Sequence, residues 1–507
     1  MSQLPTGWVV APLDAVADVL DFEREPVNSS ERESRTTGKA ARDLYPYFGA
    51  TGQVGFIDSF RSEGERVLLG EDAAPFLDPT KDKAYLATGR FWVNNHAHVL
   101  SGAGELIHNR FLCYQLNVVD YHPFVTGSTR LKLTSAAMRQ IPLVVAPAAE
   151  QTRIVAKLEE LLSDLDAGVA ELKAAQKKLQ QYRQSLLKAA VEGALTAPWR
   201  EAQRKLGSPT ETGAQLLQRI LTERRARWEA KQLAKFKEQG KAPPKDWQKK
   251  YSEPVQADTG DLPGLPEGWV WASLDQLCHF VRNGLSKTPN AEGHGHPILR
   301  INAVRPLSVQ LAEFKHVEVT PAEAVDYTVE AGDLLATRYN GSVDLLGVVG
   351  LVRHATAEVL HPDKLIRMKP VIGDALPGWI EMAANTGASR QHIVRRVKTT
   401  AGQTGIAGED LKKMPIPLPS LVEQNEAVST GWAQLEGVGT QVVWIEHMLK
   451  QSTAQRQNIL RAAFAGQLVP QDPNDEPASV LLERIRAERD ARATQQKPRS
   501  RQAREPA

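Results

Sequence analysis

Two pairs of histidines have the spacing that places both side chains on one face of a β-strand. His96 and His98 form one pair, and His294 and His296 form the other. Neutral imidazoles are common zinc ligands, but a zinc site needs at least three protein ligands. Neither pair has a further ligand at a suitable spacing, so the sequence predicts no metal site.

Motifs that carry catalysis are not found in the 507 residues. There is no Gly-x-x-x-x-Gly-Lys-Ser/Thr phosphate loop, no glycine-rich cofactor loop and no Gly-x-Ser-x-Gly elbow. The Asn-Pro-Pro-aromatic element of base methyltransferases is also missing. Pro362-Asp363-Lys364 matches part of a nuclease motif but lacks the downstream acid-x-Lys element. We therefore predict no catalytic residue and no cofactor bound by this chain.

Three polar clusters carry side chains of the types that contact nucleic acids. They are Asn94-Asn95-His96, Thr337-Arg338-Tyr339-Asn340 and Gln403-Thr404. Asn and Arg can pair with the edges of adenine and guanine, and Thr and Arg can hold phosphates. Asn and Thr in loops also satisfy nearby backbone groups, so a structural role is the alternative.

The segments that would position these clusters occur twice. Four anchors return in the same order 261 to 273 residues later, which indicates a domain duplication and not a short repeat array. The pairs are Leu4-Pro5-Thr6-Gly7-Trp8 with Leu265-Pro266-Glu267-Gly268-Trp269, Ile141-Pro142 and Glu150-Gln151 with Met414-Pro415 and Glu423-Gln424, Leu187 to Ala190 with Leu460 to Ala463, and Leu216 to Ile220 with Leu481 to Ile485.

The interiors between these anchors align almost nowhere. Repeated anchors with different sequences between them are typical of two domains that bind different targets on one symmetric scaffold. Simple drift of the interiors is the alternative. Short β-forming stretches separated by glycines, such as Tyr47 to Ile57, favour a mixed α/β fold for each interior.

A heptad pattern predicts a long helix in each copy. From Ile154 to Ala189 apolar residues alternate spacings of four and three, so this helix would be roughly 54 Å long. Residues 428 to 459 repeat the pattern less regularly. The simplest packing of two such helices is an antiparallel coiled coil.

These patterns divide the chain into six parts with pseudo-twofold internal duplication. Mixed α+β domains are expected at residues 1–150 and 263–422, and coiled-coil helices at 151–197 and 423–470. A basic linker with a helix from 214 to 236 spans 198–262, and a basic tail spans 471–507. Residues 200 to 250 hold 14 Lys and Arg against 6 Asp and Glu. Such runs are either solvated helix faces or phosphate contacts.

Composition is that of a soluble globular protein, with 42% hydrophobic and 24% charged residues. The two cysteines, Cys113 and Cys278, provide no disulfide framework, which fits a reducing compartment. No apolar run is long enough for a membrane span, and the start of the chain lacks a signal-peptide pattern. We therefore expect a cytoplasmic protein without a membrane partner.

Taken together, these motifs resemble the specificity (S) subunits of type I restriction–modification systems, and the resemblance covers nearly the whole chain. The duplicated frame and the Glu-Gln pairs ahead of long helices carry it. Further matching elements are Phe48-Gly49-Ala50-Thr51-Gly52-x-x-Gly55-x-Ile57-Asp58, Gly127-Ser128-Thr129 with Lys132-Leu133-Thr134, Gly332-Asp333-Leu334-Leu335-x-Thr337-Arg338-Tyr339-Asn340-Gly341-Ser342, and Pro415-Ile416-Pro417-Leu418-Pro419.

The resemblance implies a non-catalytic subunit that recognises a bipartite sequence in double-stranded DNA. It also implies two modification (M) subunits that use S-adenosylmethionine to methylate adenine N6. Two restriction (R) subunits would use ATP and Mg. The rival functions are a coiled-coil adaptor that binds proteins and an enzyme with an unrecognised site. The DNA sequence, the spacer length and the presence of a restriction subunit cannot be read from this chain.

Candidate DNA-contacting residues follow from the polar clusters and the residues that flank the variable loops. They are Thr51, Gln53, Asn94, Asn95, His96, Ser128, Thr129, Arg130, Lys132, Arg300, Asn302, Thr337, Arg338, Tyr339, Asn340, Arg390, Lys398, Gln403 and Thr404.

Overall fold

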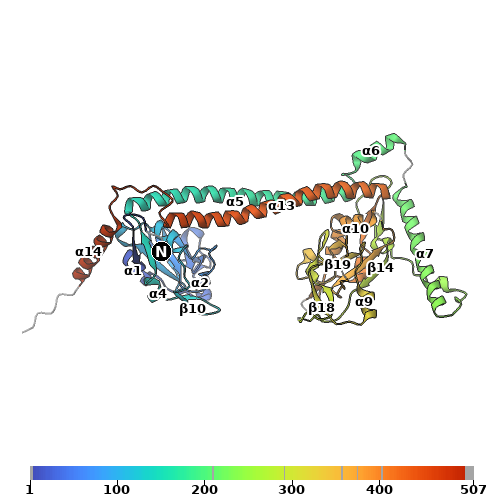
Figure 1. Cartoon of the computed structure of the whole chain (residues 1–507), viewed down its shortest axis with the longest axis horizontal. Coiled ribbons are helices and arrows are strands. Elements are labelled where there is room, and N and C mark those ends of the chain that lie inside the picture. The colour runs from blue at the N-terminus through green and yellow to red at the C-terminus, as the bar shows by residue number, and fades with distance from the viewer. Residues whose placement is uncertain are drawn as a thin grey trace, which may run out of the picture. The chain divides into compact units, whose positions relative to one another are not determined.

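The computed structural model describes residues 4–207, 211–290, 292–355, 358–373, 375–400 and 403–496. The chain forms two compact units. Unit 1 contains residues 1–174 and 444–507, and unit 2 contains residues 175–443. Each unit combines a mixed α/β domain with parts of two long helices (Figure 1). Each unit therefore takes residues from both copies of the duplication.

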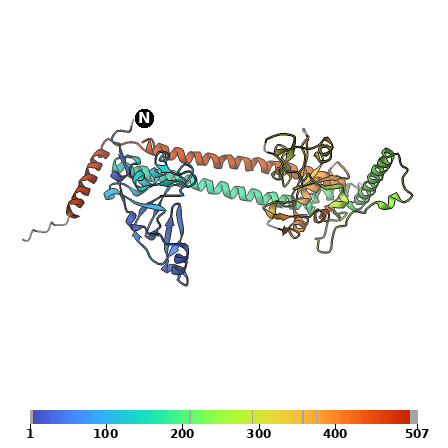
Figure 2. The same ribbon diagram turned by 90° about the horizontal axis from the view of Figure 1, so that it is seen from below.

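The long helices are α5 (Ala148–Val191) and α13 (Leu421–Phe464), each of 44 residues. In unit 1 the start of α5 packs against the end of α13, where Arg456 Nη1 lies 2.8 Å from Asp166 Oδ1. In unit 2 the end of α5 packs near the start of α13, and Tyr182 Oη donates to Gln434 Oε1 at 3.4 Å. The helices are antiparallel in both units, as the heptad pattern predicted (Figure 2). Within the described part of the chain, no helix has the length and apolar character of a membrane span.

The domain of unit 1 is closed by its first and last strands. β1 (Val9–Pro12) pairs antiparallel with β12 (Pro142–Val145), which leads into α5. A second layer has the strand order β2-β9-β6-β7, and a third has the order β4-β3-β8-β5. Their bounds are β2 (Ala17–Val19), β9 (Ala97–Gly102), β6 (Arg66–Gly70), β7 (Ala84–Ala87), β4 (Gly52–Ile57), β3 (Tyr45–Gly49), β8 (Arg90–Val93) and β5 (Ser62–Glu63).

The domain of unit 2 repeats the first two of these features. β13 (Val270–Ser273) pairs antiparallel with β24 (Pro415–Leu418), and a four-stranded antiparallel sheet has the order β14-β21-β19-β20. Its bounds are β14 (Cys278–Asn283), β21 (Leu365–Pro370), β19 (Leu334–Thr337) and β20 (Val349–Leu351). As in unit 1, the first strand lies beside the last, and the last lies beside a hairpin. The duplication therefore extends into interiors whose sequences do not align.

The interiors differ in the elements added to this common sheet. Unit 1 adds the β4-β3-β8-β5 layer and α2 (Ser29–Thr36). Unit 2 adds the pair β15 (His296–Leu299) and β18 (Phe314–Val317) and helix α9 (Pro321–Tyr327). Cys113 and Cys278 are free and buried, one in each unit.

The last sequence anchor forms a helix in each copy. α7 (Gly213–Glu238) begins one residue before the predicted start and buries Leu216 and Ile220 in the core of unit 2. α14 (Ala478–Gln496) lies within the stretch expected as a basic tail, and it buries Leu481 and Ile485 in the core of unit 1. Each of these helices therefore follows one copy along the chain and packs on the domain of the other. Between α5 and α7 lies α6 (Ala197–Leu206).

Candidate nucleic-acid interface

A buried hydrogen bond between a tryptophan and a glutamate links the start of each domain to a long helix. We call the first strand, the last strand and this bond the frame of the domain. In unit 1 the Nε1 of Trp8 donates to Glu150 Oε2 at 2.9 Å. In unit 2 the Nε1 of Trp269 donates to Glu423 Oε2, also at 2.9 Å. The bond joins the entry strand to the first turn of a long helix in each case, because Glu150 and Glu423 lie at these helix starts. It explains why both residue types return in the duplication.

The glutamine that follows each glutamate holds the loop before the helix. Gln151 accepts from the backbone N of His108 at 3.0 Å and donates to the carbonyl of Ala146 at 2.9 Å. Gln424 donates to the carbonyl of Pro419 at 3.0 Å. These bonds fix where the sheets lie on the helices, and the candidate residues lie in loops and on strands of the two domains.

In unit 1, the candidates Thr51 and Asn94 are brought together at the end of β3. Thr51 is exposed in the turn between β3 and β4, and Gln53 is exposed on β4. The backbone N of Asn94 donates to the carbonyl of Phe48 at 3.0 Å, and its Oδ1 accepts from the N of His96 at 2.8 Å. Asn95 is exposed in the same loop. One backbone bond and one side-chain bond of Asn94 therefore hold this loop, and Asn95 faces solvent.

A charged cluster in unit 1 gathers three more candidates on two acids. His96 Nδ1 lies 2.8 Å from Asp72 Oδ1, and Arg130 Nη2 lies 3.0 Å from the same oxygen. Lys132 Nζ lies 3.1 Å from Glu71 Oε1. Burial raises the pKa of Glu71, but hydrogen bonds from Arg24 and Lys132 outweigh it and hold that pKa below its ordinary value. Glu71 is therefore ionised at neutral pH and holds Lys132 in place.

The hairpin that carries Arg130 and Lys132 also exposes the two remaining candidates of unit 1. β10 (Val125–Thr126) pairs with β11 (Lys132–Leu133), and Ser128 and Thr129 are exposed in the turn between them. The backbone N of Leu133 donates to the carbonyl of Glu71 at 2.7 Å, which attaches this hairpin to the cluster.

One histidine of the first pair, His98, has a structural role in this fold, and His294 of the second pair lies in a local turn. His98 is fully buried, its Nδ1 lies 2.8 Å from Asp21 Oδ2, and its Nε2 lies 3.2 Å from the carbonyl of Leu133. Both ring nitrogens of His98 are therefore engaged. The carbonyl of His294 accepts from Asn290 Nδ2 at 2.8 Å in a local turn. Among the described residues, no group of three or more His, Cys, Asp and Glu could hold a metal ion.

In unit 2, the loop after β19 runs beside a second hairpin. Four candidates lie together there, namely Arg338, Tyr339, Asn340 and Thr404. That hairpin is β22 (Lys398–Thr400) paired with β23 (Gln403–Gly405). Tyr339 forms an isolated antiparallel bridge with Gly405, and the backbone N of Asn340 donates to the carbonyl of Thr404 at 3.2 Å. The Arg338 guanidinium lies 4.8 Å from the centre of the Tyr339 ring.

Glycine is required at position 405 for this approach. A Cβ there would lie 2.6 Å from Cδ1 of Tyr339. Lys398 is exposed on β22, opposite Gly405 in the register. The side chain of Gln403 lies outside the described residues.

Two candidates of unit 2 are used inside the protein, and we correct their assignment. Thr337 is fully buried, and its hydroxyl donates to the carbonyl of Leu345. The Arg390 guanidinium donates to the carbonyl of Leu346 and, at 2.8 Å, to that of Val343. Burial lowers the pKa of Arg390. Both residues brace the loop from Asn340 to Leu346, and we no longer count them among the residues that contact DNA.

Arg300 and Asn302 form a separate group. Asn302 Nδ2 donates to Glu313 Oε2 at 2.9 Å, and Arg300 Nη1 lies 3.7 Å from the same oxygen. Sequence reasoning missed Glu313, Glu71 and Asp72, because an acid that holds a cation from 13 to 61 residues away leaves no local pattern.

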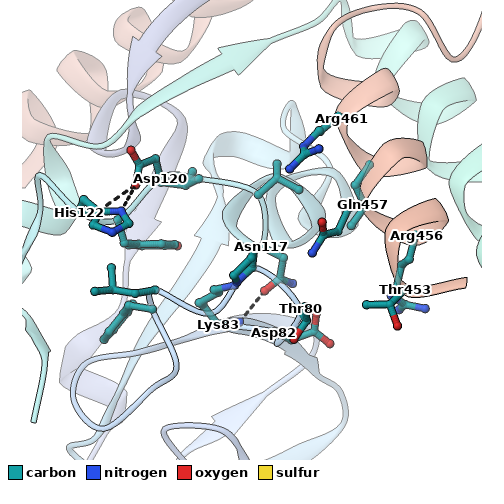
Figure 3. A pocket seen from close by; sticks show the side chains of 17 residues that line it. Thr80, Asp82, Lys83, Asn117, Asp120, His122, Thr453, Arg456, Gln457 and Arg461 are labelled. Carbon is teal, nitrogen blue, oxygen red and sulfur yellow. Dashed lines mark hydrogen bonds and ion pairs between the residues drawn. The ribbon is translucent and has the colours of Figure 1, made fainter. Parts of the chain in front are cut away.

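A pocket of about 270 Å³ in unit 1 lies away from all of these candidates (Figure 3). Thr453, Arg456 and Gln457 of α13 line one side, opposite Lys83 and Asn117 of the domain. Lys83 Nζ donates to the carbonyl of Asp78 at 2.6 Å, and Asn117 Oδ1 accepts from the N of Lys83 at 2.6 Å. These bonds stabilise the domain loops that face α13, so the pocket marks the seam between domain and helix.

Comparison with known proteins gives a consistent result. The model of the type I restriction modification DNA specificity domain matches residues 5–175. The chain is 30% identical over 376 residues to the type I restriction enzyme EcoKI specificity subunit of Escherichia coli strain K12, covering 72% of this chain and 68% of that protein. It is 22% identical to the EcoDI specificity subunit of Escherichia coli over 96% of this chain and 97% of that one.

A solved structure shares the fold. It belongs to work on complex assembly and conformational transition of the type I R-M system. The TM-score is 0.57 at 17% sequence identity, with 92% of this chain and 100% of that chain covered.

Proposed function

This chain belongs to the specificity subunits of type I restriction enzymes, and on that premise we propose that its two mixed α/β domains each read one half of a bipartite duplex DNA target. We name them recognition domain 1, residues 1–150 in unit 1, and recognition domain 2, residues 263–422 in unit 2. The chain recognises DNA, and catalysis belongs to partner subunits.

The observation that carries this proposal is the contrast between frame and loops. Both domains share a sheet of the same strand order and a Trp–Glu bond of the same length. The loops at the ends of these sheets differ in sequence and in hydrogen bonding. A rigid scaffold with variable polar loops is the usual way in which proteins vary a binding specificity.

We assign the exposed loop residues two kinds of contact. Asn94, Asn95 and Asn340 would read base edges, since an amide can pair with adenine in the major groove. Arg130, Lys132, Arg338 and Lys398 would neutralise phosphates. The remaining proposed contacts are Thr51, Gln53, His96, Ser128, Thr129, Arg300, Asn302, Tyr339, Gln403 and Thr404.

We propose that α5 and α13 bind two modification subunits. Large apolar side chains on these helices are exposed, with Tyr182 at 50%, Val443 at 67% and Trp444 at 57%. Exposed apolar residues on helices are suited to packing against further helices. The modification subunits would carry S-adenosylmethionine and methylate N6 of a flipped adenine. Two restriction subunits would add ATP- and Mg-dependent cleavage, and the complex would act on DNA in the cytoplasm.

Methylome sequencing tests the division of labour. A host that expresses the full chain with its modification subunit should gain methylation at one bipartite motif. The interior of recognition domain 1, between Pro12 and Pro142, can be exchanged for that of another specificity subunit while β1 and β12 are kept. We expect one half of the motif to change and the other to stay. A change in both halves, or methyl transfer by this chain alone, would contradict the proposal.

The two helices offer a second test, because we propose that their length sets the spacer between the half-sites. Matched insertions of seven residues after Leu172 and Met448 keep the apolar seams in phase. Each helix would lengthen by about 10 Å, or roughly three base pairs. The motif should keep both half-sites and widen its spacer. New half-sites with the old spacer would show that the helices do not set the distance.

A further inference from the structure

A basic arm extends from unit 2 beside recognition domain 2. It consists of residues 223–253, which are the outer part of α7 and a returning segment with a short helical turn, Trp247–Lys250. Figure 1 shows α7 running alongside this domain. The returning chain joins the domain again where the N of Val255 donates to Asp275 Oδ2 at 2.9 Å. The arm is thus attached to the core of unit 2 at both ends.

Aromatic packing fixes the arm as a folded element. The rings of Trp228 and Trp247 are stacked with centroids 5.7 Å apart. Tyr251 packs edge-on to Trp228 at 5.4 Å, and Phe236 packs edge-on to Trp247 at 6.2 Å. At the base of the arm, Arg224 donates to Tyr251 Oη at 2.7 Å and to the carbonyl of Cys278 at 3.0 Å. The charged side chains of the arm therefore project from a defined scaffold.

The arm has a large excess of positive charge. Residues 223–253 include ten Lys and Arg and five Asp and Glu, a net charge of +5. Arg227, Lys231 and Lys235 are exposed and follow one another at intervals of four residues. They lie on one face of α7, about 6 Å apart along the axis. A line of cations at this spacing suits an extended polyanion better than a single small anion.

A groove of about 730 Å³ separates the arm from the sheet of recognition domain 2. Arg227, Lys231 and Lys250 line it on the arm, and Arg282 and Lys369 line it on strands β14 and β21. With Arg224 and Arg367, the groove has seven Lys and Arg against two acids, Asp326 and Glu330.

The two acids that line the groove contact cations of the sheet, and on the arm Arg227 also lies 2.6 Å from Glu223. Asp326 lies 3.3 Å from Arg282, and Glu330 lies 2.9 Å from Lys369 and 3.2 Å from Arg367. All three of these cations belong to the sheet. Burial and then the nearby Arg227 lower the pKa of His279, which also lines the groove, so this residue is neutral at pH 7. The excess positive charge therefore lies mainly on the arm.

We propose that the basic arm binds phosphates of the duplex DNA that flanks the half-site read by recognition domain 2. This inference rests on the proposed function, because it takes DNA to be the ligand of that domain. Duplex DNA carries one negative charge per about 1.7 Å of its axis, so a row of cations gains affinity along it without reading bases. The contact would add affinity that is independent of sequence and restricted to one side of the target.

The test uses the assembled complex of the full chain with its modification subunits. Arg227→Ala, Lys231→Ala and Lys250→Ala are combined, and the three residues are exposed in the structure. Fluorescence anisotropy across a range of salt concentrations measures binding to a long duplex that contains the target. Each phosphate contact contributes about 0.9 to the salt slope, so the triple variant should lose roughly 2 to 3 units. The methylated motif should stay the same.

Duplexes shortened on one flank or the other locate the contact. Removal of one flank should weaken binding by the wild type, and the triple variant should be insensitive to that flank only. A matched control replaces Lys237, Lys241 and Lys245, which are exposed on the same arm but do not line the groove. The control should change the salt slope less than the triple variant does. Equal effects would assign the result to bulk charge and overturn the role of the groove.

A duplex of random sequence keeps the two proposals apart. Wild type that binds random and target DNA equally would refute recognition by the domains, while the salt slopes of the variants on random DNA would still test the arm. Unchanged slope and unchanged flank dependence in the triple variant would overturn the inference. Loss of a co-purified modification subunit with an unchanged slope would also overturn it and indicate a protein-binding surface instead.

Discussion

The two Trp–Glu pairs have the same geometry but different surroundings. In unit 2 the second oxygen of the glutamate, Glu423 Oε1, accepts from the Thr196 hydroxyl at 2.7 Å and from Arg200. In unit 1 the corresponding oxygen, Glu150 Oε1, is buried and has no hydrogen-bond partner among the described residues. Burial, opposed by the Trp8 bond, raises the pKa of Glu150.

The difference arises from α6. Leu195 and Leu216 are 21 residues apart in the first copy, whereas their counterparts Leu468 and Leu481 are 13 apart. The additional residues form α6, which brings Arg200 onto Glu423. Duplication therefore preserved the bond that positions the frame, while a local insertion changed the electrostatics around it. The geometry of a motif and its charge state can diverge independently.

The largest expected effect comes from removal of the tryptophan shared by both frames. Trp8→Ala and Trp269→Ala each remove a buried ring, and we expect a loss of about 3–5 kcal/mol of unfolding free energy in the affected unit. Hydrogen exchange with mass spectrometry can follow each unit by its own peptides. Trp→Phe at the same sites keeps most of the packing and should cost less. A frame that tolerates Ala would not depend on this bond.

Replacement of the glutamates should distinguish the two copies. Glu423→Gln removes the anion that Arg200 contacts, and we expect a loss of about 1.5–3 kcal/mol, typical of a hydrogen bond to a charged group. Glu150→Gln keeps an acceptor for Trp8 and removes a buried carboxylate, so stability at pH 7 should be unchanged or higher. Urea unfolding measures both. Equal losses for the two variants would refute the electrostatic difference.

The loops should differ in which half of the target they affect. Asn340→Ala and Asn95→Ala should each relax one half-site, by about 1–3 kcal/mol against the wrong base. Arg130→Ala removes a proposed phosphate contact, so it should weaken binding to all sequences about equally and lower the salt slope by about one. Competition binding with single-base variants of the target measures both effects. If both Asn variants relax the same half-site, our assignment of one half-site to each domain is wrong.

The smallest expected effect is a pH dependence confined to unit 1. The folded-state pKa of Glu150 lies above its unfolded value, so the folded state binds the proton more tightly. Its contribution to stability is complete below the unfolded pKa and is lost as pH rises through the folded pKa. The difference in stability between wild type and Glu150→Gln should therefore change as pH rises above about 4.5. Unfolding at a series of pH values measures it, and a constant difference would contradict it.

Local patterns predicted the elements well. The helix expected at 214–236 is α7, and the β-forming stretch from Tyr47 to Ile57 forms most of β3 and all of β4. α7 buries Leu216 and Ile220, which are four residues apart, in the core of unit 2, so its apolar spacing is that of a helix. The antiparallel pairing of the long helices was also predicted correctly.

The sequence alone did not predict which distant segments contact one another. Trp8 and Glu150 are 142 residues apart, and the repeat shows that both matter without showing that they meet. The heptad pattern predicted that Leu161 faces the other long helix. Leu162 is the more buried residue, at 4% exposure, because α5 also packs against the domain of unit 1. Thr337 and Arg390 were of the right types to bind DNA, and only the fold shows that Thr337 is buried and that Arg390 donates to backbone carbonyls.

The composition of unit 1 from both ends of the chain has a consequence for synthesis on the ribosome. All of unit 2 lies between residues 175 and 443, whereas unit 1 needs residues from 444 onward. The backbone N of Ala478 donates to the carbonyl of Gly7 at 2.8 Å, and Arg489 donates to the carbonyl of Ala17 at 3.0 Å. At about 5–20 residues per second, roughly 15–50 s separate translation of the two parts of unit 1. The domain translated first is thus completed last, and its helix-binding face is open to chaperones in the meantime.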